Sequence, residues 1–442
     1  MKDLTNLDVT IHSKEALDLF NAAITELCFF KNPLHNIIDL LKIEPDCAMG
    51  QVLNAHVNLW TTDKDDAIWS VRSNEAIHKL DHTSLTTRER MHIAAVQAWV
   101  AGDLRKTSVI LDEILIEYPC DILALLSGHQ IDFFLGEAMN LRDRVSRVLP
   151  SWDSSHPLYG FLLGMLSFGQ EESGHYKQAE ETGLRAVELN PTDVWGIHAV
   201  SHALEMQNKP EAGEKFMHDN EQYWGQDNFF IAHNAIHYGL FLLETNNMTT
   251  LINVYDKYVH NKDTKPACLT LVDASSVMWR LYLEGVDTGN RIPQLAQSWQ
   301  DKCGQNYYAF NDVHAMIAFA ASGDHVSAKK LIKSMEDYLN AGDRTSSNYL
   351  TTQRIGLPVA KAFYEFSQGH YSSAIDILMP IKNSINVFGG SHAQRDVVAR
   401  TLLDSAIKAK QKKLAKALIN ERIIKNPDGF YNQIKLEQVN GI

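Results

Sequence analysis

Recurring glycines, each followed five residues later by a small side chain, constrain this chain more than any other feature. The pairs are Gly102 with Thr107, Gly174 with Ala179, Gly323 with Ala328 and Gly369 with Ala374. Glycine ends helices well because it adopts the left-handed conformation at no steric cost. A small residue one turn into the next helix lets neighbouring helices approach closely. The pattern therefore predicts a chain of repeated helical hairpins.

Two of these units share a longer spacing of 4, 3 and 5 residues. It joins Thr107, Leu111, Ile114 and Pro119 in one unit and Ala179, Gly183, Ala186 and Pro191 in the other. The spacing is typical of the second helix of a tetratricopeptide hairpin and its terminating proline. We therefore predict an all-α fold, a tetratricopeptide-like α-α superhelix or solenoid of about eight or nine helical hairpins.

The hairpin turns also predict how the chain is organised. Turns are expected at Gly102, Gly136, Gly174, Asn208, Asn246, Gly285, Gly323 and Gly369. Residues 86–442 are expected to form degenerate repeats with a C-terminal capping helix, and residues 1–85 an N-terminal helical segment that packs on the solenoid. Residues 61–85 are polar, so we expect a connection with one short amphipathic segment. Thr86 and Glu89 have capping-box spacing and predict a helix start.

Composition indicates which partners and which cell compartment to expect. The formal net charge is −13, from 54 acidic and 41 basic residues, which predicts no nucleic-acid partner. The five cysteines form no CxxC pair and indicate a reduced chain with a cytoplasmic location. No stretch is apolar for long enough to span a bilayer, so no membrane partner is expected. The oligomeric state stays unknown at this stage.

A basic run near the end of the chain has two interpretations. One is a contact surface for an anion, and the other is the solvated face of a last, capping helix. The run comprises Lys408, Lys410, Lys412, Lys413, Lys416, Arg422 and Lys425.

Paired histidines are the main candidates for chemistry. His198 and His202 lie four residues apart and Glu205 follows, so all three share one helix face. His233 and His237 repeat the spacing 35 residues later, close to one repeat length. In tetratricopeptide folds the first helix of each hairpin lines the concave side. We therefore expect the four imidazoles on neighbouring first helices that face one channel.

Three roles remain open for these histidines. Two histidines at positions i and i+4 bind one metal ion from one helix face, so His198, His202, His233 and His237 are candidate ligands of a divalent metal. The same residues with Glu205 are candidate catalytic groups in acid–base chemistry. They are also explained as packing residues that donate hydrogen bonds between helices. The sequence HAVSH lacks the general-base glutamate of HExxH.

Two further groups are candidate ligand-binding residues. Asp273, Arg280 and His314 are expected on later first helices, where either Asp273 and Arg280 belong to an ion pair that knits two hairpins together or Arg280 holds a carboxylate or phosphate. The segment GGSHAQRD places His392, Gln394 and Arg395 in the first turn of a helix that Ser391 caps. Such a turn serves as a cap or as part of an anion site.

Several long segments resemble the tetratricopeptide repeat protein 38 family, from about Ala16 to Asn426. The resemblance is carried by LTTRERMHIAAVQAWVAGD, YPCDILALLSGHQIDFFLG, LRDRVSRVLPSW, VELNPTDVWGIHAVSHALEMQ, DASSVMWRLYLEGVD, IGLPVAKAFYEFSQGHY and GGSHAQRD. It implies an all-helical tetratricopeptide-like fold and a cytosolic setting, and it implies no reaction.

Two functions follow from these patterns. The first is a binding protein whose concave channel, lined by paired histidines, holds a small molecule or peptide. The alternative is an enzyme that uses the histidines, with or without a divalent metal as cofactor, for hydrolysis, elimination or cyclisation of an anionic metabolite. No nucleotide loop or nucleophile motif supports a narrower reaction.

Overall fold

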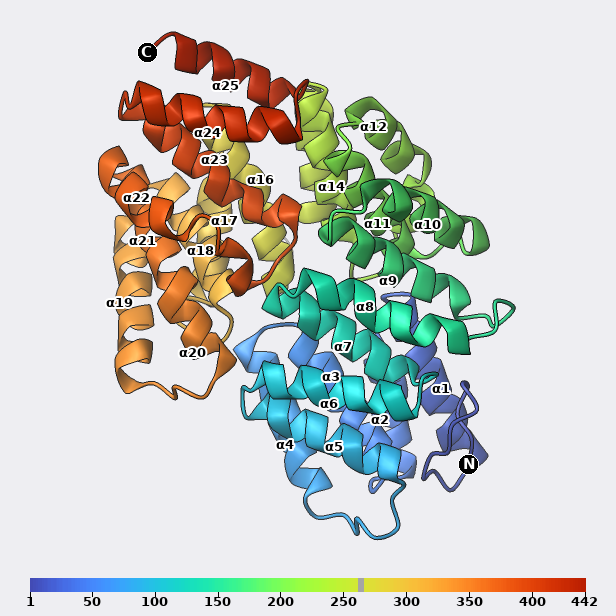
Figure 1. Cartoon of the computed structure of the whole chain (residues 1–442). Coiled ribbons are helices and arrows are strands. Elements are labelled where there is room, and N and C mark those ends of the chain that lie inside the picture. The colour runs from blue at the N-terminus through green and yellow to red at the C-terminus, as the bar shows by residue number, and fades with distance from the viewer. Residues whose placement is uncertain (261–265) are drawn as a thin grey trace. The chain divides into compact units, whose positions relative to one another are not determined.

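Helix follows helix along the chain in the computed structural model, which describes residues 1–260 and 266–442 (Figure 1). These residues contain no β-strand, although an isolated β-bridge joins Lys2 and Asp8. The chain divides into two compact units. Unit 1 comprises residues 1–200, 226–230 and 345–347, and unit 2 comprises residues 201–225, 231–344 and 348–442.

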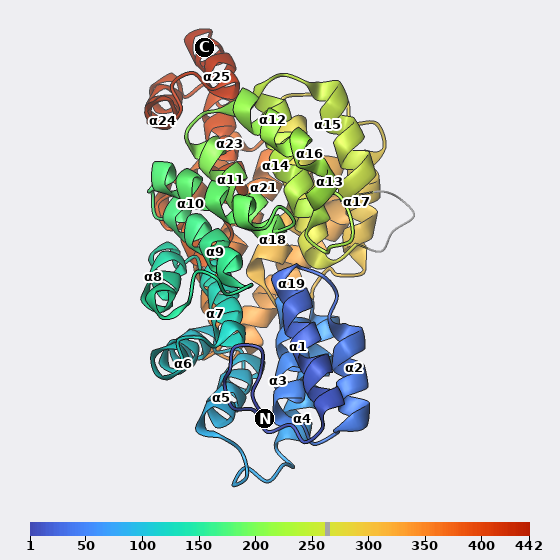
Figure 2. The same cartoon turned by 90° about the vertical axis from the view of Figure 1, so that its right-hand side faces the viewer.

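Unit 1 is a succession of antiparallel helix pairs, and its first four helices lie side by side (Figure 2). Its helices are α1 (Lys14–Cys28), α2 (Leu34–Ile43), α3 (Ala48–Trp60), α4 (Lys64–Ile77), α5 (Thr87–Val100), α6 (Leu104–Glu117), α7 (Ile122–Leu135), α8 (Ala138–Val148), the 3-10 turn Leu149–Ser151, α9 (Tyr159–Glu172) and α10 (Tyr176–Leu189). Helix α11 (Val194–Met206) begins in unit 1 and ends in unit 2.

Unit 2 continues the succession. It contains α12 (Pro210–Asp219), α13 (Glu221–Trp224), α14 (Ile231–Glu244), α15 (Met248–Val254), the π-turn Tyr255–Val259, α16 (Cys268–Leu283), α17 (Arg291–Gln300), α18 (Ala309–Ser322), α19 (His325–Ala341), most of α20 (Ser347–Thr351), the π-turn Thr352–Gly356, α21 (Leu357–Ser367), α22 (Tyr371–Leu378), the 3-10 turns Met379–Ile381 and Ile385–Phe388, α23 (His392–Lys408), α24 (Lys412–Lys425) and α25 (Phe430–Asn440).

The turn positions confirm the prediction from the repeat. All eight turn residues have positive φ, between 55° at Asn208 and 87° at Gly174. The small residue five positions after each of the four glycines is fully buried, at Thr107, Ala179, Ala328 and Ala374. The sequence pattern therefore identifies both the helix ends and the contacts between helices.

The expected fold class is confirmed for the described residues. Nine helix pairs follow Thr86, from α5 with α6 to α23 with α24, and the capping box of Thr86 and Glu89 starts the first of them. Two further pairs precede it. One expectation is wrong, because residues 64–77 form the full helix α4 and not a short segment in a connection. The domain boundary at residue 85 stays a prediction, and residues on both sides of it lie in unit 1.

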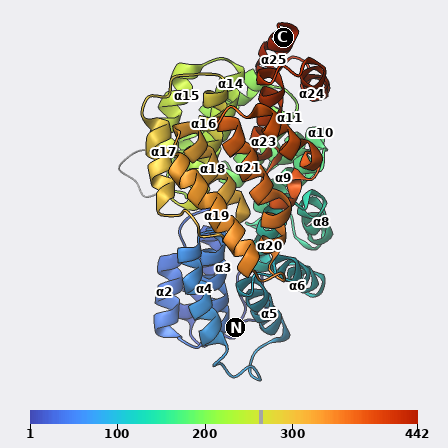
Figure 3. The same cartoon turned by 90° about the vertical axis from the view of Figure 1, so that its left-hand side faces the viewer.

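Unit 2 also brings together helices that are distant in the sequence. Helix α16 packs against α18, the first helix of the next hairpin, and against the distant helix α23 (Figure 3). Trp279 on α16 is buried and its indole N–H donates to the hydroxyl of Thr401 on α23, 122 residues away, at 2.8 Å. The Trp279 ring also packs edge-on against Phe363 and Phe366 of α21. These contacts hold α23 against α16, which is the first helix of its hairpin.

None of the described helices combines the length and the apolar character needed to cross a bilayer.

Candidate functional site

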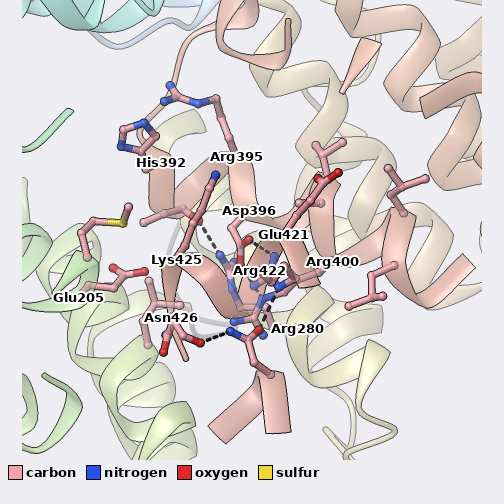
Figure 4. Close-up of a pocket in the computed structure, with 18 of the residues that line it drawn as sticks. Glu205, Arg280, His392, Arg395, Asp396, Arg400, Glu421, Arg422, Lys425 and Asn426 are labelled. Carbon is pink, nitrogen blue, oxygen red and sulfur yellow. Dashed lines mark hydrogen bonds and ion pairs between the residues drawn. The ribbon is translucent and has the colours of Figure 1, made fainter. Parts of the chain in front are cut away.

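A cavity of about 590 Å³ lies within unit 2 (Figure 4). Helices α11, α14, α16, α23 and α24 supply most of its wall. The cationic lining residues are Lys209, Arg280, Lys382, Arg395, Arg400, Arg422 and Lys425, and the acidic ones are Glu205, Glu244, Asp396 and Glu421. Seven cations against four acids give the cavity an excess of positive charge, in a chain whose net charge is −13.

Arg280 is the most deeply buried cation of this cavity, with 2% of its surface exposed. Its Nη1 donates to the backbone carbonyl of Ser276 at 2.9 Å and its Nη2 to that of Ala393 at 2.6 Å. Its side-chain partners in the described part of the chain are these carbonyls and the Ser276 hydroxyl, with no ion pair, and its buried Nε lacks a hydrogen-bond partner there. Burial lowers the pKa of this guanidinium to about 10, which still leaves it charged at neutral pH.

Asp396 neutralises two other arginines of the cavity. Its carboxylate accepts from Arg400 at 2.7 Å and from Arg422 at 2.6 Å, as the close-up shows (Figure 4). Burial alone would raise the pKa of Asp396, but Arg422 and Arg400 outweigh it and hold that pKa well below its usual range. The guanidinium of Arg400 also lies 3.8 Å from the ring centre of Tyr431. This part of the wall is therefore an ordered charge network.

The first turn of α23 brings its polar residues to two different places. Gly389 and Gly390 have positive φ, and Ser391 forms the expected cap as a capping box with Gln394. His392 and Arg395 line the cavity. Gln394 does not line it, because its side chain returns to the cap and its amide donates to Asp273 at 3.5 Å. Only part of the predicted ligand-binding turn therefore reaches the cavity.

Within unit 2, the predicted residues His202, His233 and His237 lie close together. His202 lies near the end of α11, and His233 and His237 lie one turn apart on α14. The ring centres of His202 and His237 are 4.2 Å apart, and those of His233 and His237 are 5.0 Å apart. We call these three residues the histidine cluster. His198 belongs to unit 1, where its ring packs against Phe168, Trp195 and Phe230.

Two carboxylates lie against the histidine cluster. Nδ1 of His233 donates to the carboxylate of Asp273 on α16, at 2.9 Å and 3.1 Å from its two oxygens. Nδ1 of His237 lies 3.6 Å from Oε2 of Glu205. Glu205 also lines the cavity, so it borders both the histidine cluster and the cationic wall.

Burial sets the protonation of these groups. It lowers the pKa of His202 and His237 well below the usual value of 6.5, and the neighbouring imidazoles lower it further. Both rings are therefore neutral at physiological pH. Burial also raises the pKa of Glu205 to about 7.

The residues Asp273 and Arg280 have separate partners. Asp273 pairs with His233 of α14, so it links two hairpins, whereas Arg280 bonds to the carbonyl of Ala393 on α23. His314 does not line the cavity. Its Nδ1 bonds to the carbonyl of Phe310 at 2.8 Å, and its ring packs against the ring of that residue. His314 is thus held inside the hairpin packing of α18.

Sequence reasoning missed several residues of the cavity wall. Arg400 was not a candidate, and the basic run containing Arg422 and Lys425 also had a solvated interpretation. Arg422 and Lys425 line the cavity, while Lys412 and Lys413 are exposed. The four-residue spacing of Asp396 and Arg400 is the signal that was available, because it places opposite charges on one helix face.

No family model matches the chain, and three solved structures resemble it distantly. The human IFIT1 dimer with m7Gppp-AAAA is similar over 98% of this chain and 95% of its own, with 13% identity and a TM-score of 0.36. A monomeric IFIT1 mutant with Gppp-AAAA gives 14% identity, a TM-score of 0.35 and the same coverage. Naa15/Naa10 bound to HypK-THB gives 10% identity and a TM-score of 0.24, over 97% of this chain and 60% of that one.

These matches change one expectation and leave another untested. The exclusion of nucleic acid from the net charge is corrected here, since IFIT1 chains with m7Gppp-AAAA or Gppp-AAAA are among the matches. The physical reason is that a whole-chain charge does not describe a local surface, as the cationic cavity shows. Similarity at this level assigns no ligand to this chain. The resemblance to the tetratricopeptide repeat protein 38 family stays a prediction beyond the helical fold itself.

Proposed function

We propose that this protein is a binding protein and that the cavity of unit 2 holds a small anionic ligand, either a free molecule or the acidic end of a peptide. The observation that carries the proposal is Arg280, a buried guanidinium at the cavity wall with no ion pair among the described residues. A buried charge is costly unless it is paired. An anion in the cavity would supply that partner.

The groups beside Arg280 favour a carboxylate or phosphate. A guanidinium presents its donors as a planar fork that matches the two oxygens of either group. Arg395 and His392 supply further donors from the first turn of α23. A cavity of about 590 Å³ is within the usual range for sites that hold a small molecule.

The charge network around Asp396 explains why Arg280 is the expected anchor. Arg400 and Arg422 already share the Asp396 carboxylate, and Arg400 also lies 3.6 Å from Glu244. Their charges are therefore largely balanced within the protein. Arg280 forms no ion pair of this kind among the described residues, which makes it the cation that we expect to hold an incoming anion.

Calorimetric titration with inorganic phosphate, pyrophosphate and citrate tests this proposal. We expect at least one of the three to bind the wild-type chain and to bind Arg280→Met about 10- to 100-fold more weakly, the usual effect of losing a charged hydrogen bond. Arg291→Met is the matched control, because Arg291 pairs with Asp256 outside the cavity and its loss should leave binding unchanged.

A second variant protects the test against misfolding. Arg395→Met removes another cation of the wall without removing the bonds of Arg280 to α16 and α23, and weaker binding is again expected. Binding that is equal in wild type, Arg280→Met and Arg395→Met would contradict the proposal. So would the absence of binding for all three anions at millimolar concentration.

A further inference from the structure

We infer that His202, His233 and His237 form a binding site for a divalent transition-metal ion, with zinc as the best match. One ring nitrogen from each of the three lies within 4.8 Å of those of the other two. Three imidazoles are a common protein ligand set for zinc, which accepts nitrogen donors in tetrahedral geometry. This inference does not rest on anion binding, since it uses different residues.

The distances between the rings are close to those of a metal site. A tetrahedral zinc with Zn–N bonds of about 2.0–2.1 Å places its nitrogen ligands about 3.3 Å apart. The nitrogens of the cluster start within 4.8 Å of one another, so side-chain rotations that move each by about 1 Å bring them to coordination distance. His202 and His237 already approach to 4.2 Å between ring centres.

Asp273 supports the same conclusion independently. Because Nδ1 of His233 donates to this carboxylate, the lone pair of the ring lies on Nε2. A carboxylate that holds the far nitrogen of an imidazole is the usual outer partner of a zinc-bound histidine, and it both fixes the tautomer and increases the ring's basicity. The amide of Gln394 donates to Asp273 in turn, which fixes the carboxylate.

The helix geometry holds the cluster in place. His233 and His237 share one face of α14 because four residues make about one helical turn. His202 comes from α11, and Asp273 comes from α16, the next first helix after α14 in the succession. Rigid helices position ligands more accurately than loops do.

The position of Glu205 indicates what the metal would face. This residue lies beside His237 and also lines the cavity, so the metal site borders the cationic cavity. A zinc ion with three protein ligands keeps a fourth position for water or for an oxygen of a ligand. An anionic group in the cavity would thus lie near both Arg280 and the metal.

Metal analysis of a chain without a polyhistidine tag tests the inference. The protein is stripped with EDTA, given Zn²⁺, dialysed and analysed by atomic emission, and Co²⁺ is substituted to report tetrahedral coordination by its strong visible absorption. We expect about one metal ion per wild-type chain and none in His202→Ala or His237→Ala. His260→Ala is the matched control, because it removes a buried imidazole that bonds Ser298 outside the cluster, and it should keep the metal.

A positioning variant covers the case in which the alanine variants do not fold. Asp273→Asn keeps all three ligands but removes the charged acceptor of His233, so zinc affinity measured against a competing chelator should fall about 10- to 100-fold. A purely structural role of Asp273 would change stability and leave zinc affinity intact.

Two outcomes would overturn the inference, and both are separate from anion binding. Wild-type protein that keeps no zinc or cobalt after dialysis is the first. Equal metal content in wild type and His237→Ala is the second. Arg280→Met should retain the metal while losing the anion, whereas EDTA-stripped wild type should still bind the anion, so failure of one proposal leaves the other measurable.

Discussion

Two buried arginines, one in each unit, have opposite surroundings. Arg144 on α8 of unit 1 is fully buried, and both oxygens of Asp132 accept from it, at 2.7 Å and 3.0 Å. Ser108 and Asp112 complete its partners. Arg280 on α16 of unit 2 is buried to nearly the same extent but has backbone carbonyls and one hydroxyl as its partners.

The difference separates a structural charge from a functional one. Burial by itself does not distinguish the two arginines, since both are below 3% exposed. They differ in the acid that compensates the charge. Asp132 and Asp112 pair with Arg144 in unit 1, whereas Arg280 has no such ion pair and we expect a ligand in the cavity to take that place. Four measurements sharpen or break this comparison.

The largest effect is expected at Asp132. Asp132→Ala leaves Arg144 as a buried charge without its main counter-ion, which should cost about 3–5 kcal/mol of folding free energy. Anion binding by unit 2 should be unchanged. Denaturant unfolding followed by circular dichroism measures the loss, and a change below about 1 kcal/mol would remove the structural role of Arg144.

Removal of Arg280 should have the opposite result, with a small effect on folding and a large effect on anion binding. Arg280→Met should change the free energy of unfolding by less than about 1.5 kcal/mol. The variant loses backbone hydrogen bonds, but it also removes the cost of burying a charge that has no ion pair. The same change should weaken anion binding by about 1.5–3 kcal/mol. Unfolding and calorimetry on the same sample separate the two effects. A destabilisation as large as that of Asp132→Ala would show that the two arginines do not differ.

Asp312 on α18 extends the comparison to an acid. It is buried, it has no ion pair among the described residues, and burial raises its pKa to about 7. The folded chain therefore keeps this carboxyl protonated up to about pH 7, while the unfolded chain ionises it near pH 4. Its contribution to stability is full below pH 4 and declines as the pH rises to 7.

Asp312→Asn tests this contribution directly. Between pH 4 and pH 7, wild type should lose stability relative to the variant by about 1.4 kcal/mol per pH unit. The difference between the two chains should be constant above pH 7, where both states of the wild type are ionised. Parallel denaturation curves across the pH range give the measurement, and a difference that does not change with pH would contradict it.

The smallest effect is expected at an exposed arginine. Arg105 pairs with Glu137 at 2.8 Å, but more than half of the Arg105 side chain is exposed. Water screens such a pair, so Arg105→Gln should change the free energy of unfolding by less than about 0.5 kcal/mol. A loss of stability above about 1 kcal/mol would mean that this exposed ion pair stabilises the fold without being buried.

The helical repeat was predictable from sequence because its signals are local. A glycine or asparagine with positive φ and a small buried residue five positions later lie within one hairpin. The capping residues Thr86 and Ser391 are local as well. Helix α4 was missed because its polar sequence, KDDAIWSVRSNEAI, shows no clear apolar stripe.

The cavity was only partly predictable because its wall depends on distant contacts. Arg280 and Arg395 were identified from residue type and position. Nothing within one repeat indicates that Arg280 meets the carbonyl of Ala393, 113 residues later. That contact brings Arg400 and Arg422 to the same cavity, and this explains why Arg400 was missed and why the role of Arg422 was left open.

The contact between α16 and α23 also limits how this repeat protein can change in evolution. An open solenoid gains or loses a hairpin at little cost, because each repeat touches only its neighbours. In unit 2, the bonds from Trp279 to Thr401 and from Arg280 to Ala393 span everything from α17 to α22. One extra hairpin in that stretch would separate the partners and open the cavity wall. The number of repeats between these two helices is therefore fixed in a way that the repeat pattern itself does not require.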